Sequence, residues 1–156
     1  MREAIACLRS ATFAIRTRED AAMLAHLLAG ILPEPARGEL ALLELMMNAI
    51  EHGNLEIGGP RKQELVYAGA LDAEVASRLA DPVFAERVAL VEVTRAPDRA
   101  TFAITDAGPG FPWRERLGER GDIMAPSGRG LELARAWCTD LAFNDTGNTV
   151  IMRVSW

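Results

Sequence analysis

Apolar residues recur along this chain with two different periods. Between residues 11 and 17 they alternate with polar residues, which is typical of a half-buried strand. Over residues 18–32 and 36–52 they recur at helical spacing, and two prolines separate these predicted helices. The second helix is followed by Gly53 and Asn54, residue types that commonly end a helix.

The second half of the chain combines another helical region with strand-like runs. Residues 62–88 are helical in propensity and are interrupted at Pro82. Residues 88–108 predict two strands around a tight turn, residues 131–141 predict a helix, and residues 141–156 predict a second hairpin.

This order of elements predicts an α+β fold, because the strands occur in hairpins and the helices are partly segregated from them. The expected architecture is a two-layer sandwich, in which a mixed, mostly antiparallel sheet is covered on one face by helices. The 156 residues suit one domain that spans residues 1–156.

The composition limits which classes of binding partner and which cellular location are expected for the protein. The formal net charge is -5 and no dense Lys/Arg block is present, so nucleic acid is not expected as a partner. No apolar run approaches the ~18 residues that would span a membrane, and charges interrupt the N-terminal apolar residues. Two cysteines without pairing or metal spacing fit reduced thiols, so a cytoplasmic location is expected.

The predicted helix over residues 36–52 carries a line of polar side chains. Glu44 and Asn48 are four residues apart and therefore share a face, which Glu51 and His52 continue. This line is either the narrow wet side of a core helix or the lining of a cavity. In a cavity, carboxylate and amide oxygens would suit magnesium, and a carboxylate beside a phosphate could act as a general base.

Three glycine-rich segments follow, and each has an ordinary explanation by itself. Asp106-x-Gly108-x-Gly110 directly after a predicted strand fits a ligand-binding loop or a simple turn. The segment from Ser127 to Trp137 fits an anion-binding helix start or an ordinary one. Residues 145–150 form a tight turn into the last strand.

Taken together and in this order, the four segments resemble the Bergerat ATP-binding fold of the GHKL superfamily, which includes DNA gyrase and histidine kinases. The wording "ELMMNAIEHGN" is most similar to the anti-sigma-factor serine/threonine kinases and to the ATPase domains attached to bacterial PP2C-type phosphatases. The resemblance covers nearly the whole chain.

The resemblance implies a catalytic and metal-binding role for the polar helix. Glu44 would be the general base that takes a proton from a substrate hydroxyl, and Asn48 would coordinate magnesium that bridges the ATP phosphates. His52 belongs to the same motif and is expected to order the helix end.

The resemblance also implies the contacts with ATP. Asp106 would accept a hydrogen bond from the adenine amino group, with support from Thr149 through water. The other implied nucleotide-binding residues are the glycines under the base and the residues at the helix start: Gly108, Gly110, Gly128, Arg129, Gly130 and Leu131.

Two segments depart from the compact pattern of that family. A helical insert is expected at about residues 58–86, as a packed accessory element or a partner-binding one. An ATP lid is expected at about residues 111–129, and it carries Arg114, Arg116 and Arg120, which either reach a phosphate or are solvated.

The resemblance implies a regulatory serine/threonine kinase that uses ATP and magnesium. Its expected partners are a STAS-type antagonist protein, which it phosphorylates, and a sigma factor or analogous regulator, which it sequesters; a homodimer is also implied. One alternative is a non-catalytic, nucleotide-gated binding module. The other is a detached histidine-kinase catalytic domain, for which a separate histidine-bearing chain is needed.

Overall fold

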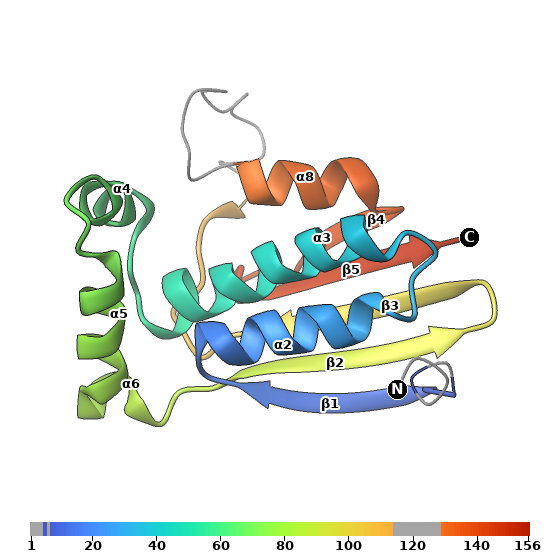
Figure 1. Ribbon diagram of the computed structural model, residues 1–156, viewed down its shortest axis with the longest axis horizontal. Coiled ribbons are helices and arrows are strands. Elements are labelled where there is room, and N and C mark those ends of the chain that lie inside the picture. The colour runs from blue at the N-terminus through green and yellow to red at the C-terminus, as the bar shows by residue number, and fades with distance from the viewer. Residues whose placement is uncertain (1–4, 6, 114–128) are drawn as a thin grey trace.

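The computed structural model of the chain describes residue 5, residues 7–113 and residues 129–156 (Figure 1). Its helices and strands, in chain order, are β1 (Ser10–Ile15), α2 (Arg18–Ala29), α3 (Pro35–Asn48), the π-helix η1 (Ala49–Asn54), α4 (Gly59–Tyr67), α5 (Leu71–Ala80), α6 (Pro82–Ala85), β2 (Ala89–Ala96), β3 (Arg99–Thr105), α8 (Arg129–Trp137), β4 (Asp140–Phe143) and β5 (Thr149–Ser155).

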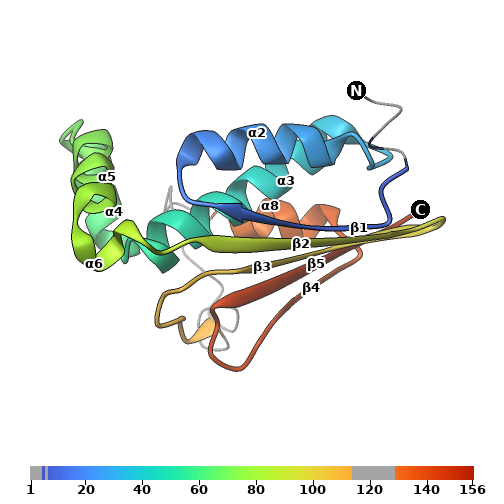
Figure 2. The same ribbon diagram turned by 90° about the horizontal axis from the view of Figure 1, so that it is seen from below.

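The strands form one five-stranded sheet in the order β1-β2-β3-β5-β4. All four pairings between these strands are antiparallel. Helices α2, α3 and α8 lie on one face of the sheet, while α4, α5 and α6 stand beyond its end (Figures 1 and 2). The predicted α+β sandwich with helices on one face is therefore confirmed.

The alternation of buried and exposed residues along the strands shows which face of the sheet packs against the helices. In β2, Val91 and Val93 are buried, whereas Leu90, Glu92 and Thr94 are exposed. Side chains of successive strand residues point to opposite faces, so one face of β2 enters the core and the other meets solvent. The buried side chains of all layers form one core, whose largest members include Phe102, Met152, Leu28, Leu42 and Met46.

Local chemistry sets where the two long helices begin. The Thr17 hydroxyl accepts a hydrogen bond from the Asp20 backbone N–H at 3.1 Å, and the Asp20 carboxylate accepts one from the Thr17 N–H at 2.9 Å. This reciprocal capping satisfies two donors that a helix start leaves unpaired. Helix α3 begins at Pro35, whose missing N–H and fixed φ suit the first helical position.

Helix α3 buries one stripe rather than most of its circumference. The buried residues recur at helical spacing and are Gly38, Ala41, Leu42, Leu45 and Met46. The helix is not buried on its other sides: Leu40 is 45% exposed, and Glu44 and Asn48 are half-buried.

The predicted helix over residues 36–52 changes its winding before it ends. After Asn48 the chain forms the π-helix η1, in which the Leu55 N–H donates to the Ile50 carbonyl five residues earlier at 2.9 Å. Composition does not signal this wider turn, because α and π windings use the same residue types. The helix predicted over 131–141 likewise ends earlier, at Trp137, because Asp140 already pairs with Arg153 in β5.

The prediction that Glu51 continues the polar line of Glu44 and Asn48 is wrong. It is 1% exposed, and its carboxylate lies 2.7 Å from Arg18 Nε of α2 and 2.5 Å from Lys62 Nζ of α4. Arg18 also lies 2.5 Å from Asp72 of α5. A buried carboxylate requires such partners, so η1 is fastened to α2 and to the helices beyond the sheet end.

No helix among the described residues is both long enough and apolar enough to cross a membrane.

Replacement of Glu51 by alanine should destabilise the protein far more than loss of a surface ion pair. Loss of one partner from a buried pair should lower the free energy of unfolding by about 3 kcal/mol, because the partly buried Lys62 loses its anion and Arg18 loses one of its two. Asp140→Ala is the matched control, since Asp140 pairs with Arg153 at the surface, and its expected effect is about 0–1 kcal/mol. Urea unfolding of both variants measures the difference; equal effects would contradict the structural role given to Glu51.

Candidate functional site

Glu44 brings α3 against the beginning of α8. A Cβ atom added to Gly130 would lie 2.0 Å from Glu44 Oε2 and 2.6 Å from its Cδ, so only a glycine allows this carboxylate to approach. Gly130 lies in the first turn of α8, and the backbone N–H groups of a first turn have no partner within their own helix, so they favour an anion. Asn48 lies on the same side of α3, one turn after Glu44.

Asp106 follows β3 and packs against the end of η1. A Cβ atom added to Gly53 would lie 2.2 Å from Asp106 Cγ, and one added to Gly108 would lie 2.3 Å from the Gly53 carbonyl oxygen. Both glycines therefore permit a contact that any side chain would block. The structure thereby joins the Asp-x-Gly segment to the His-Gly-Asn segment, 53 residues apart in sequence.

The Asp106 carboxylate is held in place and is partly desolvated. Its Oδ1 atom accepts a hydrogen bond from the Gly108 N–H at 2.8 Å. Burial raises the pKa of Asp106, while the Gly108 N–H and the positive charge of Arg87 act in the opposite direction. A half-buried carboxylate of this kind gains from a ligand that donates a hydrogen bond, because the ligand replaces lost water.

Asn54 ties the same loop to η1. Its side chain is 2% exposed, and its Oδ1 atom accepts a hydrogen bond from the Ala107 N–H at 2.8 Å. Two residues earlier, His52 forms a 2.5 Å hydrogen bond between its Nδ1 atom and the Ile57 carbonyl oxygen. This contact lies at the end of η1, and the role of His52 in ordering that end stays a prediction.

The loop after Asp106 is fastened to the turn between β4 and β5. Gly110 and Gly147 have φ angles of 78° and 79°, in the left-handed region that favours glycine. A Cβ atom on Gly110 would lie 2.0 Å from the Thr146 carbonyl oxygen, and one on Gly147 would lie 2.2 Å from that of Phe111. These contacts fix where the predicted lid leaves the body of the protein.

Asn144 organises that turn. Its Oδ1 atom accepts hydrogen bonds from the backbone N–H groups of Gly147, Asn148 and Thr149. Asn148 in turn receives the Asp106 N–H at its carbonyl oxygen, at 2.9 Å. The Thr149 hydroxyl lies 3.0 Å from that of Thr105, so its water-mediated support of Asp106 stays a prediction.

The remaining predicted site residues lie at the start of α8 or outside the described residues. Leu131 is partly buried against the core, and the backbone of Arg129 begins α8. Gly128, the side chain of Arg129 and the lid arginines Arg114, Arg116 and Arg120 lie outside the part of the chain that the structure describes, as does most of the predicted lid.

Two local groupings therefore result from the predicted residues. Glu44 meets Gly130, and Asp106 meets Gly53 and Gly108. Within the described ranges, no three His, Cys, Asp or Glu side chains are grouped closely enough to hold a metal ion. A metal at Asn48 would therefore need oxygen atoms supplied by a ligand.

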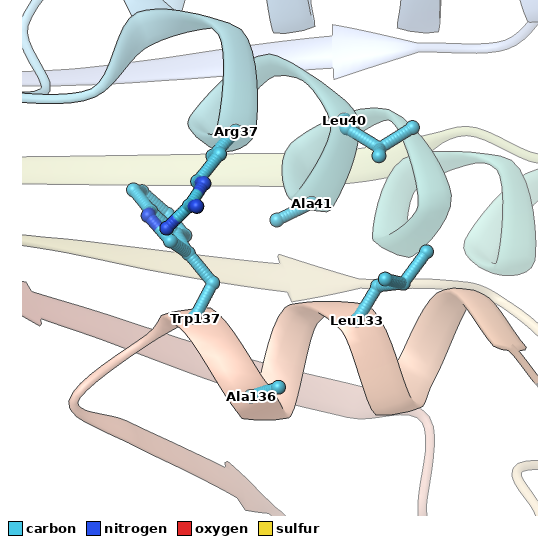
Figure 3. A pocket seen from close by; sticks show the side chains of 6 residues that line it. All are labelled: Arg37, Leu40, Ala41, Leu133, Ala136 and Trp137. Carbon is cyan, nitrogen blue, oxygen red and sulfur yellow. The ribbon is translucent and has the colours of Figure 1, made fainter.

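A groove of about 370 Å³ lies elsewhere on the helical face (Figure 3). It separates the first half of α3 from α8 and is lined by Arg37, Leu40, Ala41, Leu133, Ala136 and Trp137. None of the predicted site residues lines it, so the groove is distinct from the site around Glu44 and Asp106.

Two asparagines shape the site through contacts that the sequence pattern does not predict. Asn54 was expected as a helix terminator and as the last residue of the motif at residues 44–54, without a side-chain contact, and Asn144 was not singled out. Asn144 precedes Asp145, Thr146 and Gly147, a composition typical of turns in which an asparagine side chain caps backbone N–H groups. That signal could have identified Asn144, whereas the Asn54 contact depends on a residue 53 positions away.

Comparison with known proteins identifies a family for this chain. Residues 2–154 match the family model of the histidine kinase-like ATPase domain. No match to a curated protein was found.

Gly53→Ala should damage the packing between η1 and the Asp106 loop. The added methyl group would overlap Asp106 at its Cβ and Cγ atoms, and such overpacking lowers stability by about 1–3 kcal/mol. Gly58→Ala is the matched control, because no atom lies within 4 Å of a Cβ at that position. Thermal unfolding compares the two; an unchanged midpoint for Gly53→Ala would show that this contact is absent.

Proposed function

Because the chain belongs to the histidine kinase-like ATPase family, we propose that it is an ATP- and magnesium-dependent serine/threonine protein kinase of the anti-sigma-factor type. The family match covers nearly the whole chain and supports an ATP-binding domain of the kinase and ATPase type. The choice of serine or threonine as the acceptor is the finer step, and it rests on the similarity of residues 44–54 to the anti-sigma-factor kinases, with the position of Glu44 in support.

The observation that carries the proposal is the contact of the Glu44 carboxylate with the first turn of α8. Free N–H groups at a helix start favour phosphate, so transferable phosphate is expected beside this carboxylate. ATP binding alone gains nothing from a negative charge at that place. A carboxylate there is useful as a base that accepts a proton from an attacking hydroxyl group.

The residues around Asp106 fit the adenine end of ATP. The carboxylate retains an acceptor atom, Oδ2, to which none of the described residues donates a hydrogen bond, while Oδ1 accepts one from the Gly108 N–H. The exocyclic amino group of adenine is a donor of the required kind. Gly108 and Gly110 carry no side chains that would block a flat base, which supports the roles predicted for them.

The residues around Asn48 fit magnesium that arrives with the nucleotide. An amide oxygen is a hard ligand, and magnesium commonly combines one or two protein ligands with waters and phosphate oxygens. In this proposal ATP supplies the transferable phosphoryl group, and magnesium neutralises the charge of its oxygen atoms.

The chain's own residues then have simple tasks. Glu44 takes the proton of a serine or threonine hydroxyl as the hydroxyl oxygen bonds to the γ-phosphorus and the bond to the ADP oxygen breaks. Asp106 would orient the base, and Asn48 would hold the phosphates through magnesium, so that the two residues position the transferred group. Positioning and charge neutralisation carry most of phosphoryl transfer, so this small set can suffice.

The proposed substrate is a small STAS-like antagonist protein, and the proposed sequestered partner is a sigma factor or an analogous regulator. Both follow from the similarity of residues 44–54 to the anti-sigma-factor kinases, as does a homodimer.

Calorimetry of ATP binding with and without magnesium tests the nucleotide site. Wild-type protein should bind ATP in a magnesium-dependent manner, and Asn48→Ala should lose that dependence because it loses the proposed amide ligand. Gln63→Ala, which removes a carboxamide from α4 away from the proposed site, is the control. Absence of ATP binding by the wild type would reject the proposed function, and retained magnesium dependence in Asn48→Ala would reject Asn48 as the ligand.

Glu44→Gln separates a kinase from a nucleotide-gated binding module. The variant keeps the shape of the side chain but not its basicity, so ATP should still bind while the rate of phosphoryl transfer falls about 100-fold or more. The readout is radiolabelled phosphate on the STAS-like substrate. Equal transfer by wild type and variant would exclude Glu44 as the base, and a variant that still switches partner binding without transfer would favour the module.

A further inference from the structure

We propose, on the basis of the proposed ATP-binding function, that Arg87 is a positioning residue of the nucleotide site: Arg87 holds Asn54, and Asn54 holds the turn that carries Asp106. Through Arg87 the helices beyond the sheet end take part in recognition of the adenine base. Arg87 lies outside the motifs that indicate the family, and Asn54 is the last residue of the motif at residues 44–54.

Arg87 anchors the segment that follows η1. Its Nη1 atom donates to the Asn54 carbonyl oxygen at 3.1 Å and to Glu56 Oε1 at 2.6 Å. Its guanidinium group lies 5.1 Å from the centre of the Phe84 ring in α6. Stacking on an aromatic ring fixes the plane of a guanidinium group, and with it the direction of its N–H bonds.

Arg78 of α5 repeats this arrangement one residue further along. Its Nη1 atom donates to the Leu55 carbonyl oxygen at 2.6 Å, and its guanidinium group lies 5.6 Å from the same Phe84 ring. Two guanidinium groups around one ring thus hold two successive backbone carbonyls, those of Asn54 and Leu55. We call Arg78, Phe84 and Arg87 the arginine clamp.

Asn54 transmits this restraint to the nucleotide site. Its Oδ1 atom receives the Ala107 N–H, and Ala107 lies between Asp106 and Gly108. Its Nδ2 atom is buried and has no hydrogen-bond partner among the described residues, so the Ala107 contact is the polar interaction that the side chain makes there. A shift of the Asn54 backbone would therefore move the turn on which the Asp106 carboxylate is oriented.

Arg87 also acts on Asp106 by its charge. Burial raises the pKa of Asp106, and the positive charge of Arg87 is among the influences that lower it. The hydrogen bonds of Arg87 thus help to direct the Asp106 carboxylate, and its charge favours the ionised form of that carboxylate. Both effects support Asp106 as a hydrogen-bond acceptor for the adenine base.

If Arg87 only stabilised the fold, its replacement would affect nucleotide affinities differently than if it positioned Asp106. General loosening of the fold weakens every nucleotide equally. Misplacement of Asp106 weakens only ligands that use this carboxylate. Purine riboside triphosphate lacks the 6-amino group of ATP, so the ratio of its Kd to that of ATP reports what Asp106 contributes.

The test measures both Kd values by calorimetry for wild type, Arg87→Gln, Arg87→Lys and Arg61→Gln. Arg87→Gln should weaken ATP about five- to tenfold and leave purine riboside triphosphate nearly unchanged, as expected for one misplaced hydrogen bond. Arg87→Lys retains the charge and one donor, so it should restore at least half of the loss. Arg61 pairs with Glu64 at the surface of α4 and is the matched control.

Asp106→Asn sets the largest change that the ratio can show, and melting curves confirm that each variant is folded. If Arg87→Gln does not fold, Glu56→Gln replaces it, because Glu56 is 41% exposed and anchors the same guanidinium group. Its expected change in the ratio is about two- to threefold.

The outcomes separate the inference from the proposed function. A wild type that does not bind ATP rejects both. A wild type that binds ATP, with an unchanged ratio in the Arg87 variant or with both nucleotides weakened equally, rejects the positioning role and leaves the proposed function intact.

Discussion

Gly53 and Asp106 come from opposite layers of the protein, and their contact leaves no room for a β-carbon on the glycine. The helical layer contributes η1, and the sheet contributes the end of β3. Everything proposed for the nucleotide site depends on this approach, because it places the Asp106 carboxylate beside the helix that carries Glu44 and Asn48. The hydrogen bond from the Ala107 N–H to Asn54 then fixes the two layers relative to each other.

The contact between Gly53 and Asp106 requires that η1 keep one position, and charged side chains on the other side of η1 hold it there. Glu51 is buried between Arg18 and Lys62, and the arginine clamp holds the backbone just after η1. Ion pairs of this kind contribute less to stability than apolar packing of equal volume, but they demand specific partners. The polar network therefore serves to fix one arrangement of η1, while the apolar core under α2 and α3 provides most of the stability.

Much of the fold could be predicted from periodicity, since alternation in β2 and β3 and helical spacing in α2 and α3 are local properties. The segments that contain Glu44, Asp106 and Gly130 could also be found, because few residue types suit phosphate, base and close backbone approach. The π winding of η1, the burial of Glu51 and the contacts of Asn54 and Arg87 could not. Each depends on residues 30 or more positions away, or on winding that residue type does not determine.

The π-helix has a consequence for insertions and deletions. Six residues, Ala49–Asn54, are wound with hydrogen bonds that span five residues instead of four. A π turn holds more residues than an α turn, so removal of one residue there would allow ordinary α winding over nearly the same rotation about the helix axis. The residues after the deletion would face nearly the same way, and Gly53 would still approach Asp106. A change of length by one residue is therefore less disruptive in this segment than in the α-helix that precedes it.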